Sequence, residues 1–184
     1  MYRFLNQRNV STIKRGQLMI IVNNNNFPDI YAALKNSIYA VAYNYLQNSN
    51  DACDIMQDSF VKLLESGQNF NDLNHIKAWT IRVCINASKN FLRDNKIHTE
   101  IQFADYIANC ISGVNESHDP TVLQAVLKLP EKYRIPIHLF YYEDYSIKEI
   151  ASALGISESA GKVRLKRGRD MLRKKLEKEL VYSV

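Results

Sequence analysis

The chain has 184 residues, of which 46% are apolar and 23% charged, the balance of a globular protein with one domain or two small ones. Six glycines and four prolines argue against a β-sandwich or a Gly-rich nucleotide-binding fold and favour helices. The net charge of +5 points to a polyanionic partner. The sequence contains no run of 18 apolar residues, so it predicts no membrane-spanning segment. Cys53, Cys84 and Cys110 form neither a disulfide framework nor a zinc motif, so we expect a reducing cytoplasm.

The first half of the chain predicts a tail followed by two helices. Residues 1–26 carry four basic and no acidic side chains and show no clear hydrophobic period, so we expect a tail. Pro28 suits the first turn of a helix whose apolar residues, spaced by three and four, continue from Ile30 to Leu46. Asn50 or Asp51 is expected to cap a second helix that ends at Ser66-Gly67. A polar loop, Gln68 to Asn74, follows.

A third helix is predicted from about His75 to Lys96, and one of its faces is cationic. Arg82, Asn86, Lys89, Arg93 and Lys96 are spaced 4, 3, 4 and 3, which places them within about 40° of one line along the helix. Such a stripe is suited to tracking phosphates while the amide contacts a base. On spacing alone, however, a solvated helix face is the simpler interpretation.

The next segment, residues 97–119, carries four acidic residues and no lysine or arginine. It contains Ser112-Gly113 and Asp119-Pro120, both breaker signals. We therefore predict an acidic linker between two helical units, with a surface loop inside one domain as the alternative.

The C-terminal third predicts a helix-turn-helix. An apolar helix around Val122 to Leu129 precedes an apolar segment from Tyr133 to Tyr142, which Pro136 is expected to interrupt. Ser146 and Glu149 then form a capping box, and Gly155 supplies a left-handed C-cap. Ser157 caps the following helix. The segment thus consists of a helix, a short turn that contains Gly155, and a second helix, which is the pattern of a helix-turn-helix.

The second helix of this pair is strongly basic, with a net charge of +6 over residues 156–175. Its predicted buried side carries Leu165, Gly168 and Leu172. The opposite side presents Ser159, Val163, Lys166 and Arg167. Side chains so arranged fit the major groove of DNA, with flanking cations on phosphates. An ordinary basic C-terminal helix is the alternative, which the capped first helix and the Gly turn make less attractive.

Taken together, these motifs resemble those of the sigma-70-type initiation factors of bacteria, in the small extracytoplasmic-function (ECF) class. Two stretches in the first half are similar to parts of the family's region 2. They are Asp54-Ile55-Met56-Gln57-Asp58-Ser59-Phe60 and the segment from Ala78-Trp79 to Asn86. Four stretches in the second half are similar to the family's region 4. They are Leu129-Pro130-Glu131, Glu149-Ile150-Ala151, Gly155-Ile156-Ser157-Glu158, and the segment from Lys162 to Arg167. The resemblance covers about residues 27–96 and 120–181, and the motifs occur in the family's order.

The resemblance implies an all-α fold of two small helical domains. These are a region 2-like bundle at 27–96 and a region 4-like helix-turn-helix domain at 120–184, with a tail at 1–26 and a linker at 97–119. It implies that the chain binds core RNA polymerase at the β′ clamp helices and β flap, that it binds promoter DNA, and that an anti-sigma factor is a possible partner. No cofactor, metal site or enzymatic activity is implied.

The resemblance also implies roles for individual residues. The polymerase-binding residues would lie on the second helix, and the loop Gln68 to Asn74 would capture a base flipped from the duplex. The polymerase-binding set is Asp54, Gln57, Asp58 and Phe60. The set for the −10 promoter element is Arg82, Asn86, Lys89, Asn90, Arg93 and Lys96. The set for the −35 element is Ser159, Lys162, Val163, Arg164, Lys166 and Arg167.

Gly161 departs from the family, which usually has Val or a similar apolar residue at this point of the basic helix. Glycine inside a helix costs roughly 0.5–1 kcal/mol relative to alanine, and a missing buried side chain leaves a cavity. We therefore expect Gly161→Val to raise the melting temperature.

Two other functions compete with an initiation factor. A helix-turn-helix regulator could bind DNA independently of polymerase, with residues 27–96 used for dimerisation or sensing, but it would leave the Asp54–Phe60 surface and the cationic stripe unused. An enzyme is the weakest candidate, because His75, His98, His118 and His138 show no metal spacing and no catalytic motif is present.

Overall fold

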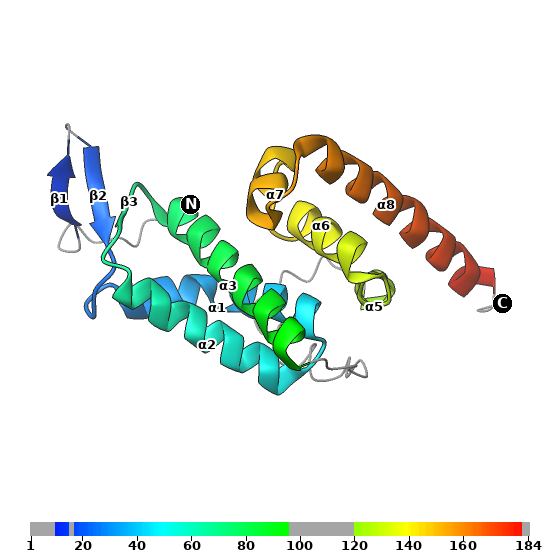
Figure 1. Cartoon of the computed structure of the whole chain (residues 1–184), viewed down its shortest axis with the longest axis horizontal. Helices are drawn as coiled ribbons and strands as arrows, with labels where there is room; N and C mark the ends of the chain where they lie inside the picture. The colour runs from blue at the N-terminus through cyan, green and yellow to red at the C-terminus, as the bar shows by residue number, and fades with distance from the viewer. Residues whose placement is uncertain (1–9, 15–16, 96–119, 182–184) are drawn as a thin grey trace.

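The computed structural model describes residues 10–14, 17–95 and 120–181, so the predicted linker 97–119 and Lys96 lie outside the described part. The first half contains α1 (Phe27–Leu46), α2 (Ser49–Glu65) and α3 (Leu73–Asn95). The second half contains α5 (Pro120–Leu127), α6 (Glu131–Tyr141), α7 (Ile147–Leu154) and α8 (Glu158–Val181). The two groups lie side by side in Figure 1, and α8 extends from the second group to the C-terminus. The predicted helical architecture is confirmed.

The starts of α2 and α3 differ from the prediction by two or three residues, for a local reason in each case. The cap of α2 is Asn48, not Asn50 or Asp51, because Asn48 has extended backbone and its side chain accepts a hydrogen bond from the Asp51 amide. Helix α3 begins at Leu73, where Asp72 Oδ1 accepts from the His75 amide at 2.7 Å. Carboxylate and carboxamide oxygens thus satisfy amides that the first turn leaves unpaired.

The prediction of a tail over residues 1–26 is wrong for part of that segment. Strands β1 (Val10–Lys14) and β2 (Gln17–Ile21) form an antiparallel hairpin, and β2 also pairs with β3 (Asn69–Phe70), which lies in the predicted polar loop. Ile20 pairs with Phe70, and both are buried in the core. Strands this short carry too few alternations to give a period in the sequence.

The helix-turn-helix is confirmed in detail, with one correction upstream of it. The capping box of Ser146 and Glu149 is present, Gly155 has a φ of 69°, and Ser157 Oγ accepts from the Ala160 amide at 3.2 Å. The expected interruption at Pro136 is wrong, because α6 continues through it. The carbonyl that Pro136 leaves without a helical donor is that of Lys132, an exposed residue in the first turn, where water can replace the missing bond.

The two halves pack against each other, which the predicted tether between them did not anticipate. Helix α1 contacts α6, and α3 contacts α7. One continuous buried cluster includes Ile38 and Ile81 of the first half together with Leu139 and Leu154 of the second. The arrangement is therefore closed, with a shared core between the two helical groups.

Two glycines of α8 give a matched test of packing. A Cβ at Gly161 would meet Ile147 and Ala151 at 3.5–3.8 Å, whereas one at Gly168 would meet Ile137 Cγ1 at 2.9 Å and the Tyr133 carbonyl oxygen at 3.2 Å. Gly161→Ala should therefore raise the free energy of unfolding by roughly 0.5–1 kcal/mol. Gly168→Ala should lower it by about 1–3 kcal/mol, because α6 must move away from α8. Thermal unfolding by circular dichroism measures both changes, and a loss of stability in Gly161→Ala would contradict this account of the site.

Candidate polymerase and nucleic-acid interfaces

The outward face of α8 is an exposed row of polar and cationic side chains around one apolar residue. Ser159, Lys162, Lys166 and Arg167 are exposed, and Val163 is 48% exposed. On the other side, Leu165 is 2% exposed and Gly168 lies against α6. The predicted division of the helix into two faces is thus observed. Cations can bind phosphates, and an exposed Val can contact the methyl group of thymine.

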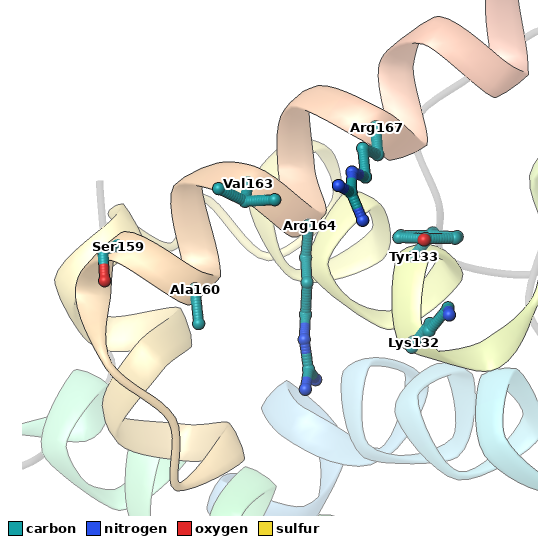
Figure 2. A pocket seen from close by; sticks show the side chains of 7 residues that line it. All are labelled: Lys132, Tyr133, Ser159, Ala160, Val163, Arg164 and Arg167. Atoms are coloured by element: carbon teal, nitrogen blue, oxygen red, sulfur yellow. The ribbon is translucent and has the colours of Figure 1, made fainter.

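A shallow pocket of about 460 Å³ lies between this row and the start of α6 (Figure 2). Lys132 and Tyr133 line it from α6, and the Lys132 ammonium lies 4.9 Å from the centre of the Tyr133 ring. A hydrogen bond from Arg167 lowers the pKa of Tyr133. This concentration of donors suits an anion such as a DNA phosphate. Sequence reasoning missed Lys132 and Tyr133, since only the fold brings α6 beside α8.

Arg164 differs from the other predicted −35 residues. Its side chain points away from the exposed row and towards α1 (Figure 2), and it interacts electrostatically with Tyr45 of that helix. Arg164 is half-buried. It lines the same pocket as Ser159, Val163 and Arg167, but its side chain is directed away from the exposed row.

The cationic stripe on α3 is at the surface, but part of it is in contact with the second half. Arg82, Asn86, Asn90 and Arg93 are exposed, whereas Lys89 is half-buried. The Arg82 guanidinium donates to Ser152 Oγ at 2.5 Å, and Lys89 Nζ donates to the Leu154 carbonyl at 3.1 Å. Burial lowers the pKa of Lys89. Among the described members of the stripe, Arg82, Asn86 and Arg93 are exposed as their spacing predicts, and Arg82 and Lys89 also contact α7.

The predicted base-capturing loop lies at the start of α3 and is partly ordered by β3. Phe70 is fully buried and packs edge-to-face against Trp79 at a centroid distance of 6.0 Å. Gln68 and Asn71 are exposed on either side of it. The side-chain oxygen of Asn69 is buried without a hydrogen-bond partner. The loop therefore combines a rigid aromatic support with polar groups that are accessible or unsatisfied.

On α2, three of the four predicted polymerase-binding residues share an exposed face, and the fourth does not. Asp54, Gln57 and Asp58 are exposed. Phe60 is 1% exposed and packs edge-to-face on Tyr31 at a centroid distance of 4.8 Å, so it supports the helix from inside and does not reach a partner.

Val61, which is 52% exposed, is the apolar residue on the accessible face of α2. Sequence reasoning missed it, although a signal was present. Val61 follows Gln57 and Asp58 by four and three residues, so helical geometry places it on their face. An apolar side chain surrounded by polar ones is the composition of a protein interface with an apolar anchor and polar rim.

Within the described residues, no group of three or more His, Cys, Asp or Glu side chains could hold a metal ion. His138 lies beside Glu143, with 3.4 Å between Nε2 and Oε1. Among the helices that the structure describes, none is long and apolar enough to cross a membrane.

Comparisons with known proteins agree with this geometry. Residues 30–97 match the family model "Sigma-70 region 2", and residues 121–172 match "Sigma-70, region 4". RNA polymerase sigma factor SigV of Bacillus subtilis is 31% identical over 147 residues, covering 79% of this chain and 87% of SigV. ECF RNA polymerase sigma factor SigW of the same organism is 30% identical over 165 residues, covering 82% and 88%. The fold is also similar to that of sigma factor RpoE of Bartonella quintana, solved in complex with the anti-sigma factor NepR, with a TM-score of 0.59 at 19% identity, covering 83% of this chain and 97% of RpoE.

Proposed function

Since the chain belongs to the sigma-70 family of RNA polymerase initiation factors, we propose that it directs core RNA polymerase to promoters with defined −10 and −35 elements and assists their melting. In this role it binds and positions macromolecules and catalyses no reaction itself. It acts in the cytoplasm, where the polymerase and promoter DNA are located. Residues 27–96 and 120–184 serve as the two functional units. An anti-sigma factor is a further partner that we propose.

The observation that carries this proposal is the presence of two separate cationic surfaces and one acidic surface on the same chain. The stripe on α3, with Asn86 and Arg93, is assigned to the −10 element, and the exposed row on α8 to the −35 element. The α2 face, with Asp54, Asp58 and Val61, is assigned to the polymerase. A regulator that reads DNA with one helix would need only the second of these surfaces.

Energetics explain why the two DNA-binding surfaces should act together on the polymerase. A specific base contact contributes about 1–3 kcal/mol of discrimination, so each small unit alone binds a promoter weakly. Once both are held by one polymerase, the second contact becomes intramolecular and forms at a high effective concentration. Lys132 and Tyr133 are proposed to add a phosphate contact beside the −35 element.

The competing function is a helix-turn-helix regulator that binds DNA without polymerase, and the exposed row on α8 is compatible with it. The two proposals differ in the use of α2 and α3. Run-off transcription with the purified full chain, bacterial core polymerase and candidate promoters, including the one upstream of its own gene, separates them. We expect a transcript that requires both the chain and the promoter. Absence of a transcript on every candidate, together with tight binding of the chain alone to DNA, would favour the regulator.

Val61→Glu should weaken the binding of the chain to core polymerase by about tenfold or more, because the complex would bury an unpaired carboxylate in place of an apolar side chain, at a cost of roughly 1.4 kcal/mol or more. The substitution is at an exposed position, so the fold should be unaffected. Ala32→Glu, at an exposed position of α1, is the matched control. Titration of labelled core polymerase measures the affinity. Equal affinities for the two variants would show that the polymerase does not contact this face of α2.

A further inference from the structure

Strand β2 lies against the loop Gln68 to Asn74, to which the resemblance assigns the capture of a flipped base. We propose that residues 19–26, the end of β2 and the turn that follows it, form a brace that positions this loop for the −10 element, with Ile20 and Asn26 as positioning residues. The inference deepens the proposed function and rests on it. The brace precedes the segment 30–97 that matches region 2, so it adds to the part of the chain that the family model describes.

The brace holds the first half of the loop by strand pairing. Strand β3 consists of Asn69 and Phe70, which pair with Ile21 and Ile20, while β1 pairs with the other edge of β2 (Figure 1). Ile20 is 8% exposed, and it shares one apolar cluster with the fully buried Phe70. A strand of two residues is not stable by itself. The backbone conformation of Asn69 and Phe70 therefore depends on β2.

Asn26 fixes the end of the brace to the start of α1. Its side chain is fully buried, with Nδ2 donating to the Ile21 carbonyl and Oδ1 accepting from the Asn23 amide, both at 2.8 Å. The Asn26 carbonyl accepts from the Ile30 amide at 3.2 Å, which is the first turn of α1. Because side chains alternate between the two faces of a strand, a shift by one residue would turn Ile20 out of the core. These hydrogen bonds therefore fix the register in which β2 pairs with β3.

The second half of the loop is held by the start of α3. The Asn71 amide donates to His75 Nδ1 at 3.3 Å, and the His75 amide donates to Asp72 Oδ1 at 2.7 Å. The Phe70 ring joins the two supports, because it packs edge-to-face on the His75 ring at a centroid distance of 5.3 Å. Both halves of the loop are thus ordered in the free chain, and Gln68 and Asn71 are left exposed.

This order has a consequence for the selection of a base. Extruding a base from the duplex costs stacking energy, and a loop that is already ordered adds no further entropic cost when it binds that base. Loss of the brace should therefore lower discrimination at the captured position of the −10 element. Binding to core polymerase should remain, because the α2 face is made by other residues.

Four variants separate positioning from general stability. Ile20→Ala removes the apolar contact of the brace with Phe70, and Asn26→Ala removes its anchor on α1. Ile20→Val keeps a branched apolar side chain in the same register and should behave as wild type. Ile55→Ala is the matched control, because Ile55 is 7% exposed and lies ten residues, or about 15 Å of helix, before α2 ends at Glu65.

Hydrogen exchange of the full chain, followed by mass spectrometry, measures the order of the loop directly. In Ile20→Ala and Asn26→Ala, the peptide that carries residues 68–72 should exchange about fivefold faster than in wild type, or more. In Ile20→Val and Ile55→Ala the exchange of this peptide should stay within about twofold of wild type. Unchanged exchange in both alanine variants of the brace would overturn the proposal.

Run-off transcription with core polymerase then tests base selection, on an active promoter and on copies with single-base changes across its −10 element. Both brace variants should lose roughly three- to tenfold of the discrimination at one −10 position and less than about twofold at the others. Ile20→Val and Ile55→Ala should keep the wild-type ratios, because a general loss of stability lowers transcription from every template alike.

An equal loss of discrimination at every −10 position, or no loss at any, would overturn the role of the brace in base capture. A different result separates this inference from the proposed function. If exchange in the loop rises as expected but neither the wild type nor any variant gives a transcript from any promoter, the brace stands as a support of the loop and the proposed function fails.

Discussion

Alanine at both Asn86 and Arg93 should lower promoter opening by the chain with core polymerase by roughly 10- to 100-fold, because one base contact and one phosphate contact are lost together. Both side chains are exposed, and the ion pair of Arg93 with Asp94, at 3.0 Å, lies on the surface, so the fold should be unchanged. Affinity for core polymerase should also be unchanged, because the α2 face remains intact. Permanganate reactivity of the melted promoter measures the opening step directly.

Lys35→Ala is the control for this experiment, since it removes an exposed cation from α1 outside the stripe. Its effect on opening should be within twofold of wild type, in line with the small effects of isolated surface charges. If the double substitution abolished binding to core polymerase instead, the exposed face of α3 would be a polymerase surface and its assignment to the −10 element would be wrong.

Arg134→Met should lower the free energy of unfolding by about 2–4 kcal/mol, which corresponds to a fall of roughly 5–15 °C in melting temperature. Arg134 is 6% exposed, and its guanidinium donates to the carbonyls of Asn44 at 2.7 Å, Leu127 at 2.9 Å and Leu129 at 3.0 Å. Burial lowers its pKa to about 10, so the group remains charged at neutral pH. Methionine keeps most of the side-chain volume but leaves buried carbonyls without this donor.

The matched control for Arg134 is Arg173→Met, because the Arg173 side chain is 80% exposed and its ion pair with Glu177 lies on the surface. We expect a change in the free energy of unfolding of less than about 0.5 kcal/mol for this variant. Scanning calorimetry of both proteins gives the comparison. A melting temperature for Arg134→Met equal to that of the control would show that the carbonyls find other donors, and that Arg134 does not hold the α1, α5 and α6 segments together.

Local signals in the sequence predicted most of the fold. Helix periods, the Ser146–Glu149 capping box and the Gly155 C-cap depend on residues only a few positions apart, so they can be recognised without knowledge of the fold. The same holds for the exposed row on α8, because a rotation of 100° per residue determines which side chains lie on the exposed face of the helix and which on the buried face. The hairpin is different, because β2 is stabilised by pairing with β3, which lies about 50 residues further along the chain.

The candidate site shows the same limit. Exposure of Asn86 and Val163 follows from helical geometry, whereas the engagement of Arg82 and Lys89 depends on a packing of the two halves that no local pattern records. Phe60 was assigned to the polymerase surface because its motif includes it, although the core of the bundle requires a large aromatic at that position. Residues that serve packing and residues that serve binding alternate along one helix, and only burial distinguishes them.

The most direct test of the central claim is fluorescence anisotropy of a labelled promoter duplex, titrated with the full chain in the absence and presence of core polymerase at one fixed salt concentration. The free chain should bind the promoter and a scrambled duplex with equally low affinity. With polymerase present, binding to the promoter should be at least 100-fold tighter than binding of the free chain. Tight, sequence-specific binding by the chain alone would instead show that it is a DNA-binding regulator that acts independently of polymerase.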